Sequence, residues 1–127
     1  MAGALANVSA LVVDCTDPDT LAAFWRSLIG GQLVTYPELG VVALRAPGLT
    51  FDFVRNEDRK QTKNRWHLDP ASDDPRGAVA NAHDLGASRA DDVCVSEHFT
   101  VLRDPEGNEF CVLTDAPSSA PWMAPSP

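Results

Sequence analysis

The sequence predicts an α+β protein in which a βαβββ unit occurs twice. A proline follows Asp17 and again Asp74, and each pair begins an amphipathic stretch that ends at a glycine, Gly30 or Gly86, after a similar length. One strand-like stretch precedes each helix, and three short strand-like stretches follow it. This internal repeat decides the fold class more firmly than any single segment does.

The first unit is expected over residues 8–56. Apolar, β-favouring residues without Gly or Pro predict a strand over 8–14. Asp17 is suited to cap the next helix, whose apolar stripe recurs at three- and four-residue spacing. The stripe consists of Leu21, Phe24, Trp25 and Leu28. Turn residues separate three further strands, expected over 32–36, 41–45 and 49–55.

A charged linker, 57–64, leads to the second unit, expected over 65–114, so that 1–114 form one domain. Its first strand, 65–69, alternates, and Trp66 is expected between helix and sheet. The helix runs from Asp74 to Gly86. Three strands complete the unit, at about 87–95, 99–104 and 108–113.

Residues 115–127 are rich in Pro, Ser and Ala and show no pattern of a buried face. We therefore expect a flexible or draped tail. Trp122 and Met123 are its sizeable apolar residues and are candidates for docking on a partner subunit.

Composition restricts the function. The 127 residues are 44% hydrophobic and carry a net charge of −8, with a pI of about 4.6. An acidic surface repels phosphate backbones, so nucleic-acid binding is not expected. No apolar run is long enough for a membrane helix, and no signal peptide is recognisable. Three cysteines without CxxC spacing indicate reduced thiols, so we expect a cytoplasmic protein.

The strand over 65–69 carries the polar residues of most interest. Arg65, His67 and Asp69 share one of its faces, which is typical of a pocket wall rather than of an apolar core. On the last strand Glu109 shares a face with Cys111. An imidazole and a carboxylate from two strands are candidate metal ligands. The plainer interpretation is a hydrogen-bonded His67 with Glu109 as its partner or as a surface charge.

Three motifs carry a resemblance to a known family: residues 14–18 (DCTDP), 63–69 (KNRWHLD) and 104–111 (DPEGNEFC). With the two βαβββ units they make the chain resemble the vicinal oxygen chelate superfamily, and within it the glyoxalase-like and bleomycin-resistance-like proteins. The resemblance spans residues 8–113. It implies that the two units form a cupped, incomplete barrel, and that the protein is a homodimer whose cup takes a small molecule.

The resemblance also implies a divalent metal in the cup. Imidazole and carboxylate ligands suit Zn, Fe, Mn, Ni or Co without choosing among them. His67 and Glu109 match ligand positions, and Asp52 is the third candidate, although a one-residue change of register would put Phe53 there. Ala10 stands where metal-binding members have His, and alanine cannot ligate, which weakens the expectation of a metal.

Several functions stay open at this point. The first is a metal-dependent lyase, isomerase or dioxygenase, in which Asp69 or Asp14 moves a proton. The second is a metal-free cyclase, dehydratase or epimerase, with His67 as general base oriented by Glu109 or Asp14, and with Arg65 beside an oxyanion. The third is a drug- or ligand-binding protein of the bleomycin-resistance type, and a purely structural module is the fourth.

Arg65, Asp69 and Cys111 complete the candidate site as residues that would contact substrate. For Arg65 a salt bridge to Asp14 or Glu109 is the simpler expectation. For Cys111 a buried, inert thiol is the simpler expectation.

Overall fold

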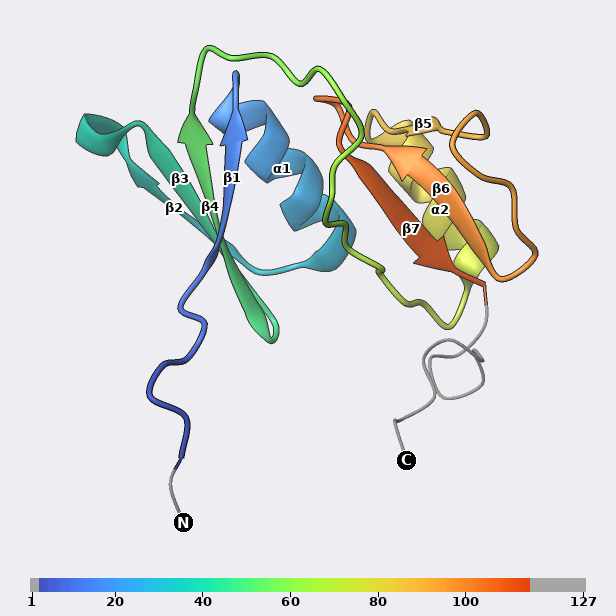
Figure 1. The fold of residues 1–127 in the computed structure, drawn as a ribbon, viewed down its shortest axis with the longest axis horizontal. Helices are drawn as coiled ribbons and strands as arrows, with labels where there is room; N and C mark the ends of the chain where they lie inside the picture. Colours follow the sequence, from blue (N-terminus) through green and yellow to red (C-terminus); the bar gives the residue numbers. More distant parts are fainter. Residues whose placement is uncertain (1–2, 115–127) are drawn as a thin grey trace. The chain divides into compact units, whose positions relative to one another are not determined.

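The structure is a computed structural model that describes residues 3–114 of the chain. The tail over 115–127, with Trp122 and Met123, lies outside the described residues. The chain divides between Arg59 and Lys60 into two compact units. Figure 1 shows that each unit pairs one helix with one face of its own sheet.

The first unit has the predicted βαβββ order. Its sheet has the order β1-β4-β3-β2, with β1 parallel to β4 and the other pairs antiparallel. The elements are β1 (Leu11–Cys15), α1 (Pro18–Ile29), β2 (Gln32–Tyr36), the 3-10 turn η1 (Pro37–Leu39), β3 (Val41–Ala46) and β4 (Leu49–Arg55).

Helix α1 begins where the sequence predicts. The Asp17 carboxylate accepts hydrogen bonds from the backbone N–H and the hydroxyl of Thr20, and Pro18 occupies the first turn. The helix packs on the sheet through Trp25, whose ring stacks on Phe51 at a centroid distance of 6.3 Å. Phe51 in turn stacks on Phe53 at 5.8 Å, so both phenylalanines lie on the helix face of β4.

The register of β4 decides between Asp52 and Phe53 for the opposite face. Phe53 is fully buried on the α1 side, and side chains alternate along a strand, so Asp52 lies on the face away from the helix. Its neighbours across the sheet are Val12 on β1 and Ala43 on β3. Of the two candidates it is therefore Asp52, and not Phe53, that faces away from α1, while its role as a metal ligand stays a prediction.

The second unit has the sheet order β5-β6-β7, and both strand pairs are antiparallel. Its elements are α2 (Pro75–Asp84), β5 (Ser88–Arg89), β6 (Phe99–Arg103) and β7 (Glu109–Leu113). Asp74 caps α2 by accepting from the Gly77 N–H at 3.1 Å. Asp104 closes the β6–β7 turn by accepting from the backbone N–H groups of Glu106 and Asn108.

The opening segment of the second unit is extended but is not a regular strand. The N–H of Cys111 donates to the Leu68 carbonyl, and the N–H of Leu113 donates to that of Pro70. This pattern is half of a parallel ladder. The other half would need an N–H at residue 70, which proline lacks. The Glu109 carbonyl is occupied by the Asn64 side chain, at 2.9 Å, so the segment runs beside β7 with few bonds of its own.

Two further expectations for this unit are wrong. The strand expected over 87–95 is only β5, because a turn at Asp91 takes the chain out of the sheet. Trp66 does not fill the space between helix and sheet, and its side chain is 82% exposed. The incomplete ladder leaves the segment without the strict alternation on which that expectation depended.

No helix within residues 3–114 is both long and apolar enough to cross a bilayer.

Candidate functional site

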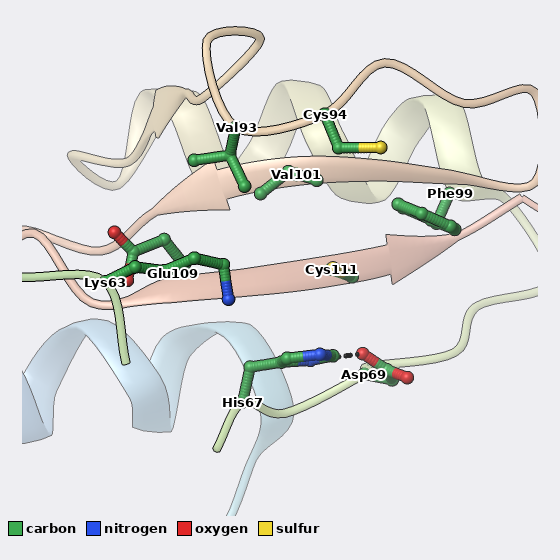
Figure 2. A pocket seen from close by; sticks show the side chains of 9 residues that line it. All are labelled: Lys63, His67, Asp69, Val93, Cys94, Phe99, Val101, Glu109 and Cys111. Carbon is green, nitrogen blue, oxygen red and sulfur yellow. Dashed lines mark ion pairs between the residues drawn. The ribbon is translucent and has the colours of Figure 1, made fainter. Parts of the chain in front are cut away.

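A pocket of about 330 Å³ lies within the second unit, against the face of β6 and β7 that carries Val101 and Cys111 (Figure 2). Three segments form its walls: the extended segment at 63–69, the loop before β6, and the two strands. The lining residues are Lys63, His67, Asp69, Val93, Cys94, Phe99, Val101, Glu109 and Cys111. This volume is at the lower end of ligand pockets, about 300–1,000 Å³.

The hydrogen bonds to β7 place Asp69 opposite Cys111, and His67, two residues earlier, lines the same pocket. The Nδ1 atom of His67 lies 2.9 Å from Oδ1 of Asp69, and Figure 2 marks this pair. A carboxylate on Nδ1 selects the tautomer with a proton there, so Nε2 keeps its lone pair. His67 can therefore accept a proton or ligate a metal through Nε2.

Cys111 lies in the middle of β7 with 9% of its surface exposed. Burial is the main reason that its pKa rises from 9.0 to about 11, and the negative charge of Asp69 adds to this. The thiol is therefore protonated and unreactive at neutral pH. The expected buried thiol is what the structure shows, and its sulfur nevertheless faces the pocket.

Glu109 occupies one end of the pocket, and its carboxylate is fully engaged. It accepts the backbone N–H of Asn64 at 2.9 Å and lies 3.0 Å from Nζ of Lys60, while Nε of Arg103 is 3.5 Å away. Burial alone would raise its pKa, but these donors hold the pKa of Glu109 below 4.5. Glu109 thus ties residues 60–64 to β7.

Lys63 lines the pocket with a cation. Its Nζ donates to the Asn64 carbonyl at 3.3 Å, and within residues 3–114 no carboxylate pairs with it. Figure 2 shows its side chain directed over β7 into the pocket. The positive charge of Lys63 acts against the rise in the pKa of Cys111, so Lys63 lies close enough to interact electrostatically with this thiol.

Comparison with protein families gives a match to the glyoxalase-like domain over residues 10–113, which is most of the chain. The chain belongs to the glyoxalase-like domain family. The predicted membership of the vicinal oxygen chelate superfamily is thereby confirmed. No curated protein sequence matches the chain significantly.

Solved structures of this glyoxalase-like class show the same α+β fold, which confirms the predicted fold class. A glyoxalase/bleomycin resistance protein/dioxygenase family enzyme from Burkholderia phytofirmans has a TM-score of 0.70 at 19% identity, covering 84% of this chain and 97% of its own. A glyoxalase/bleomycin resistance protein from Albidiferax ferrireducens has a TM-score of 0.60 at 23% identity, covering 84% and 96%.

A third structure holds a metal. A mutant of the fosfomycin resistance protein FosX from Listeria monocytogenes, complexed with Mn(II) and 1S,2S-dihydroxypropylphosphonic acid, has a TM-score of 0.72 at 11% identity. It covers 91% of this chain and 94% of its own. At such identity the likeness shows the fold, and the metal belongs to that protein.

Three side chains of this glyoxalase-like domain bring possible metal-binding atoms together. Ligand atoms of His67, Asp69 and Cys111 all lie within 4.8 Å of one another. One nitrogen, one oxygen and one sulfur donor form a set that zinc accepts, and three protein ligands leave a position for water or substrate. Cys111 must lose its proton to ligate, so the set fits a metal that competes well for thiolate.

The other predicted site residues are placed as follows. Asp52 lies on the helix-free face of the first unit's sheet, and Ala10 and Asp14 lie in or just before β1 of the same sheet. Their part in catalysis or ligation stays a prediction. Arg65 is exposed and does not line the pocket, and the cations that Glu109 pairs with are Lys60 and Arg103 instead. The alternative salt bridge of Arg65 to Asp14 stays a prediction.

Sequence reasoning did not single out Lys63, Cys94 or the apolar wall formed by Val93, Phe99 and Val101. Lys63 lies in the stretch predicted as a charged linker, and Cys94 is an exposed thiol in a loop. The signal available was position: Lys63 lies only four residues before His67, at the start of the segment that carries His67 and Asp69. The loop over 91–98 carries no pattern that would have predicted its fold over β6.

Proposed function

We propose that this glyoxalase-like domain binds a small oxygenated organic molecule in the second-unit pocket and transforms it with the help of a divalent metal. The observation that supports this proposal is the meeting of His67, Asp69 and Cys111 at the pocket wall. The reaction class is a lyase or isomerase reaction or a dioxygenation, all of which develop negative charge on an oxygen.

In this proposal His67, Cys111 and Asp69 would supply a nitrogen, a sulfur and an oxygen to the metal, and the Asp69 oxygen would exchange its contact with the His67 ring for the metal. A divalent ion so held supplies Lewis-acid polarisation of a substrate oxygen. Glu109 and Asp52, predicted as ligands from the sequence, remain proposals, and Glu109 would first have to exchange Lys60 for the metal.

The chain's own residues supply the remaining functions. Before a metal binds, the Asp69 carboxylate, 2.9 Å from Nδ1 of His67, fixes the orientation of the ring. Val93, Phe99 and Val101 exclude water from one side of the pocket. Exclusion of water strengthens every charge interaction within it.

Metal analysis of protein purified without an affinity tag tests this function. We expect about one equivalent of a transition metal, and loss of it in His67→Ala and Cys111→Ser. Turnover of small vicinal diketones, hemithioacetals or catechols should disappear in the same variants. Protein that contains no metal, and binds none at micromolar concentration, would rule the metal-assisted reaction out.

A second candidate is a metal-free acid–base enzyme, which the short His67–Asp69 pair favours. Here the Nε2 atom of His67 is the base and Asp69 orients it, in the place where sequence reasoning expected Glu109 or Asp14. Cys111→Ser separates the two candidates, because only the metal-assisted reaction needs the sulfur. Full activity in Cys111→Ser, together with a loss of about 10²–10⁴-fold in His67→Ala, would establish the metal-free reaction.

We also propose that the protein is a homodimer and acts in the cytoplasm. In the four-stranded sheet β1 and β2 each pair with one strand, and exposed sheet edges of this kind are commonly covered in assemblies. Sedimentation equilibrium tests the dimer, and a single species at 13.6 kDa across micromolar concentrations would contradict it.

A further inference from the structure

The charges that line the pocket are unevenly compensated. The Glu109 carboxylate lies within 3.5 Å of two cations, Lys60 and Arg103, and accepts a backbone N–H. Asp69 pairs with the His67 ring. Both pocket carboxylates therefore have partners already. A cationic ligand would have to compete with those partners for either carboxylate.

Lys63, in contrast to these carboxylates, is not paired with an opposite charge within residues 3–114. Within residues 3–114 its Nζ contacts one neutral acceptor, the Asn64 carbonyl at 3.3 Å, which is a long hydrogen bond. An ammonium has three donors, so at least two stay available. Figure 2 shows that this nitrogen is directed into the pocket, toward the side that holds His67.

The remaining wall is apolar. Val93 and Phe99 pack against the buried cluster of Ala90, Val101 and Cys111. This wall faces the pocket from β6 and from the loop before it. A ligand that satisfies both walls carries its negative oxygen at one end and an apolar, ring-sized body at the other.

Within the function proposed above, we propose that the substrate class is a small organic anion: a carboxylate with a neighbouring carbonyl or hydroxyl oxygen and an aryl or branched alkyl body. Lys63 pairs with the carboxylate and is the residue that selects for it. The neighbouring oxygen lies toward His67, and the apolar body lies against Val93, Phe99 and Val101. Lys63 binds the substrate carboxylate through its charge and takes no part in proton transfer.

Two probes of nearly equal shape isolate the charge. Benzoylformate and 1-phenyl-1,2-propanedione share the phenyl ring and two adjacent oxygens, and differ in that a carboxylate replaces an acetyl group. Their dissociation constants for the full chain, as purified, are measured by calorimetry and by amide chemical-shift changes at pH 7 in low salt. The shift changes also report whether each probe contacts the second unit's pocket.

The variants are Lys63→Gln, Lys63→Arg and Arg76→Gln. Arg76 is exposed on α2 and does not line the pocket. Arg76→Gln therefore makes the same change of net charge as Lys63→Gln at a position outside the pocket. We expect the wild type to bind benzoylformate about tenfold more tightly than the diketone, as a charged hydrogen bond would give. Lys63→Gln removes this preference without weakening the diketone, whereas Lys63→Arg and Arg76→Gln keep it. Added salt reduces the preference in the wild type.

Equal binding of the two probes by the wild type, or equal weakening of both by Lys63→Gln, would overturn the selection of anions by Lys63. The pocket and its proposed function would survive that result. If neither probe shifts the resonances of His67 and Cys111 at millimolar concentration, the proposed function fails along with the substrate class.

Discussion

At Cys111, burial disfavours the thiolate form that metal ligation would require. This residue sits in a fully buried strand, so its thiolate is disfavoured, yet its sulfur lies beside a histidine and an aspartate that together suit a metal. Sequence reasoning placed Cys111 and Glu109 on one face of this strand, and the structure agrees. Their different environments were not predictable, because they depend on Lys60, Asn64 and Arg103, which come from other parts of the unit.

Burial of Cys111 predicts a loss of stability in alkali. Its pKa is raised from 9.0 to about 11 in the folded protein, so between these values the unfolded chain binds fewer protons than the folded one. Stability is therefore retained below pH 9 and falls as pH rises toward 11, by at most about 2–3 kcal/mol. Urea unfolding of the metal-free protein at several pH values measures this, and Cys111→Ser should lose that share of the pH dependence. Cys94→Ser, which changes an exposed thiol, should keep it.

Glu109 predicts the opposite behaviour in acid. Its pKa is held below 4.5 in the folded state, so its ionised form stabilises the protein above pH 4.5, and this contribution is lost as pH falls through the lowered value. Glu109→Gln should cost about 1–3 kcal/mol at pH 7, because Lys60 loses its charged partner, whereas Arg103 keeps its closer pair with Asp92. The cost should shrink toward pH 3. Glu97→Gln, at a side chain that is 88% exposed, serves as the control.

At the scale of elements, the helices were predictable and the second unit's strands were less so. Asp17 and Asp74 cap their helices as expected, because the capping interaction is local and depends on adjacent residues. The segment at 65–69 lost its regular ladder to Pro70 and to the neighbouring Asn64 side chain, which bonds the Glu109 carbonyl 45 positions further along the chain. A bond of such long range cannot be read from alternation along the chain.

The connection between α1 and β2 depends on Gly31. Its φ is +113°, and a Cβ there would lie 2.5 Å from the Arg45 carbonyl oxygen. Gly48, at φ +80°, has open space around it. Alanine at either position costs roughly 1–2 kcal/mol for the left-handed backbone, and at Gly31 the clash with β3 adds about 1–3 kcal/mol. Thermal unfolding of Gly31→Ala and Gly48→Ala compares the two, and equal losses would show that the backbone contact is relaxed easily.

At the scale of the whole molecule, the repeat in the sequence predicted the family and the α+β class, and the match over residues 10–113 confirms them. The proposed metal ligands were harder to predict from the sequence. A family pattern specifies positions along strands, whereas ligation depends on which side chains keep a free lone pair after the local contacts are made. Glu109 is engaged by cations, and Cys111 and Asp69 lie beside His67 instead.

The most direct measurement of this assignment is titration of the metal-free protein with Co(II), followed by absorption spectroscopy. A cobalt ion held by Cys111 and His67 gives a thiolate-to-cobalt charge-transfer band in the near ultraviolet, and binding that releases the Cys111 proton strengthens as pH rises. We expect the band in the wild type and in Cys94→Ser, and its loss in Cys111→Ser. A wild type that binds cobalt without such a band, or binds none, would contradict the assignment of Cys111 and His67 as the metal ligands.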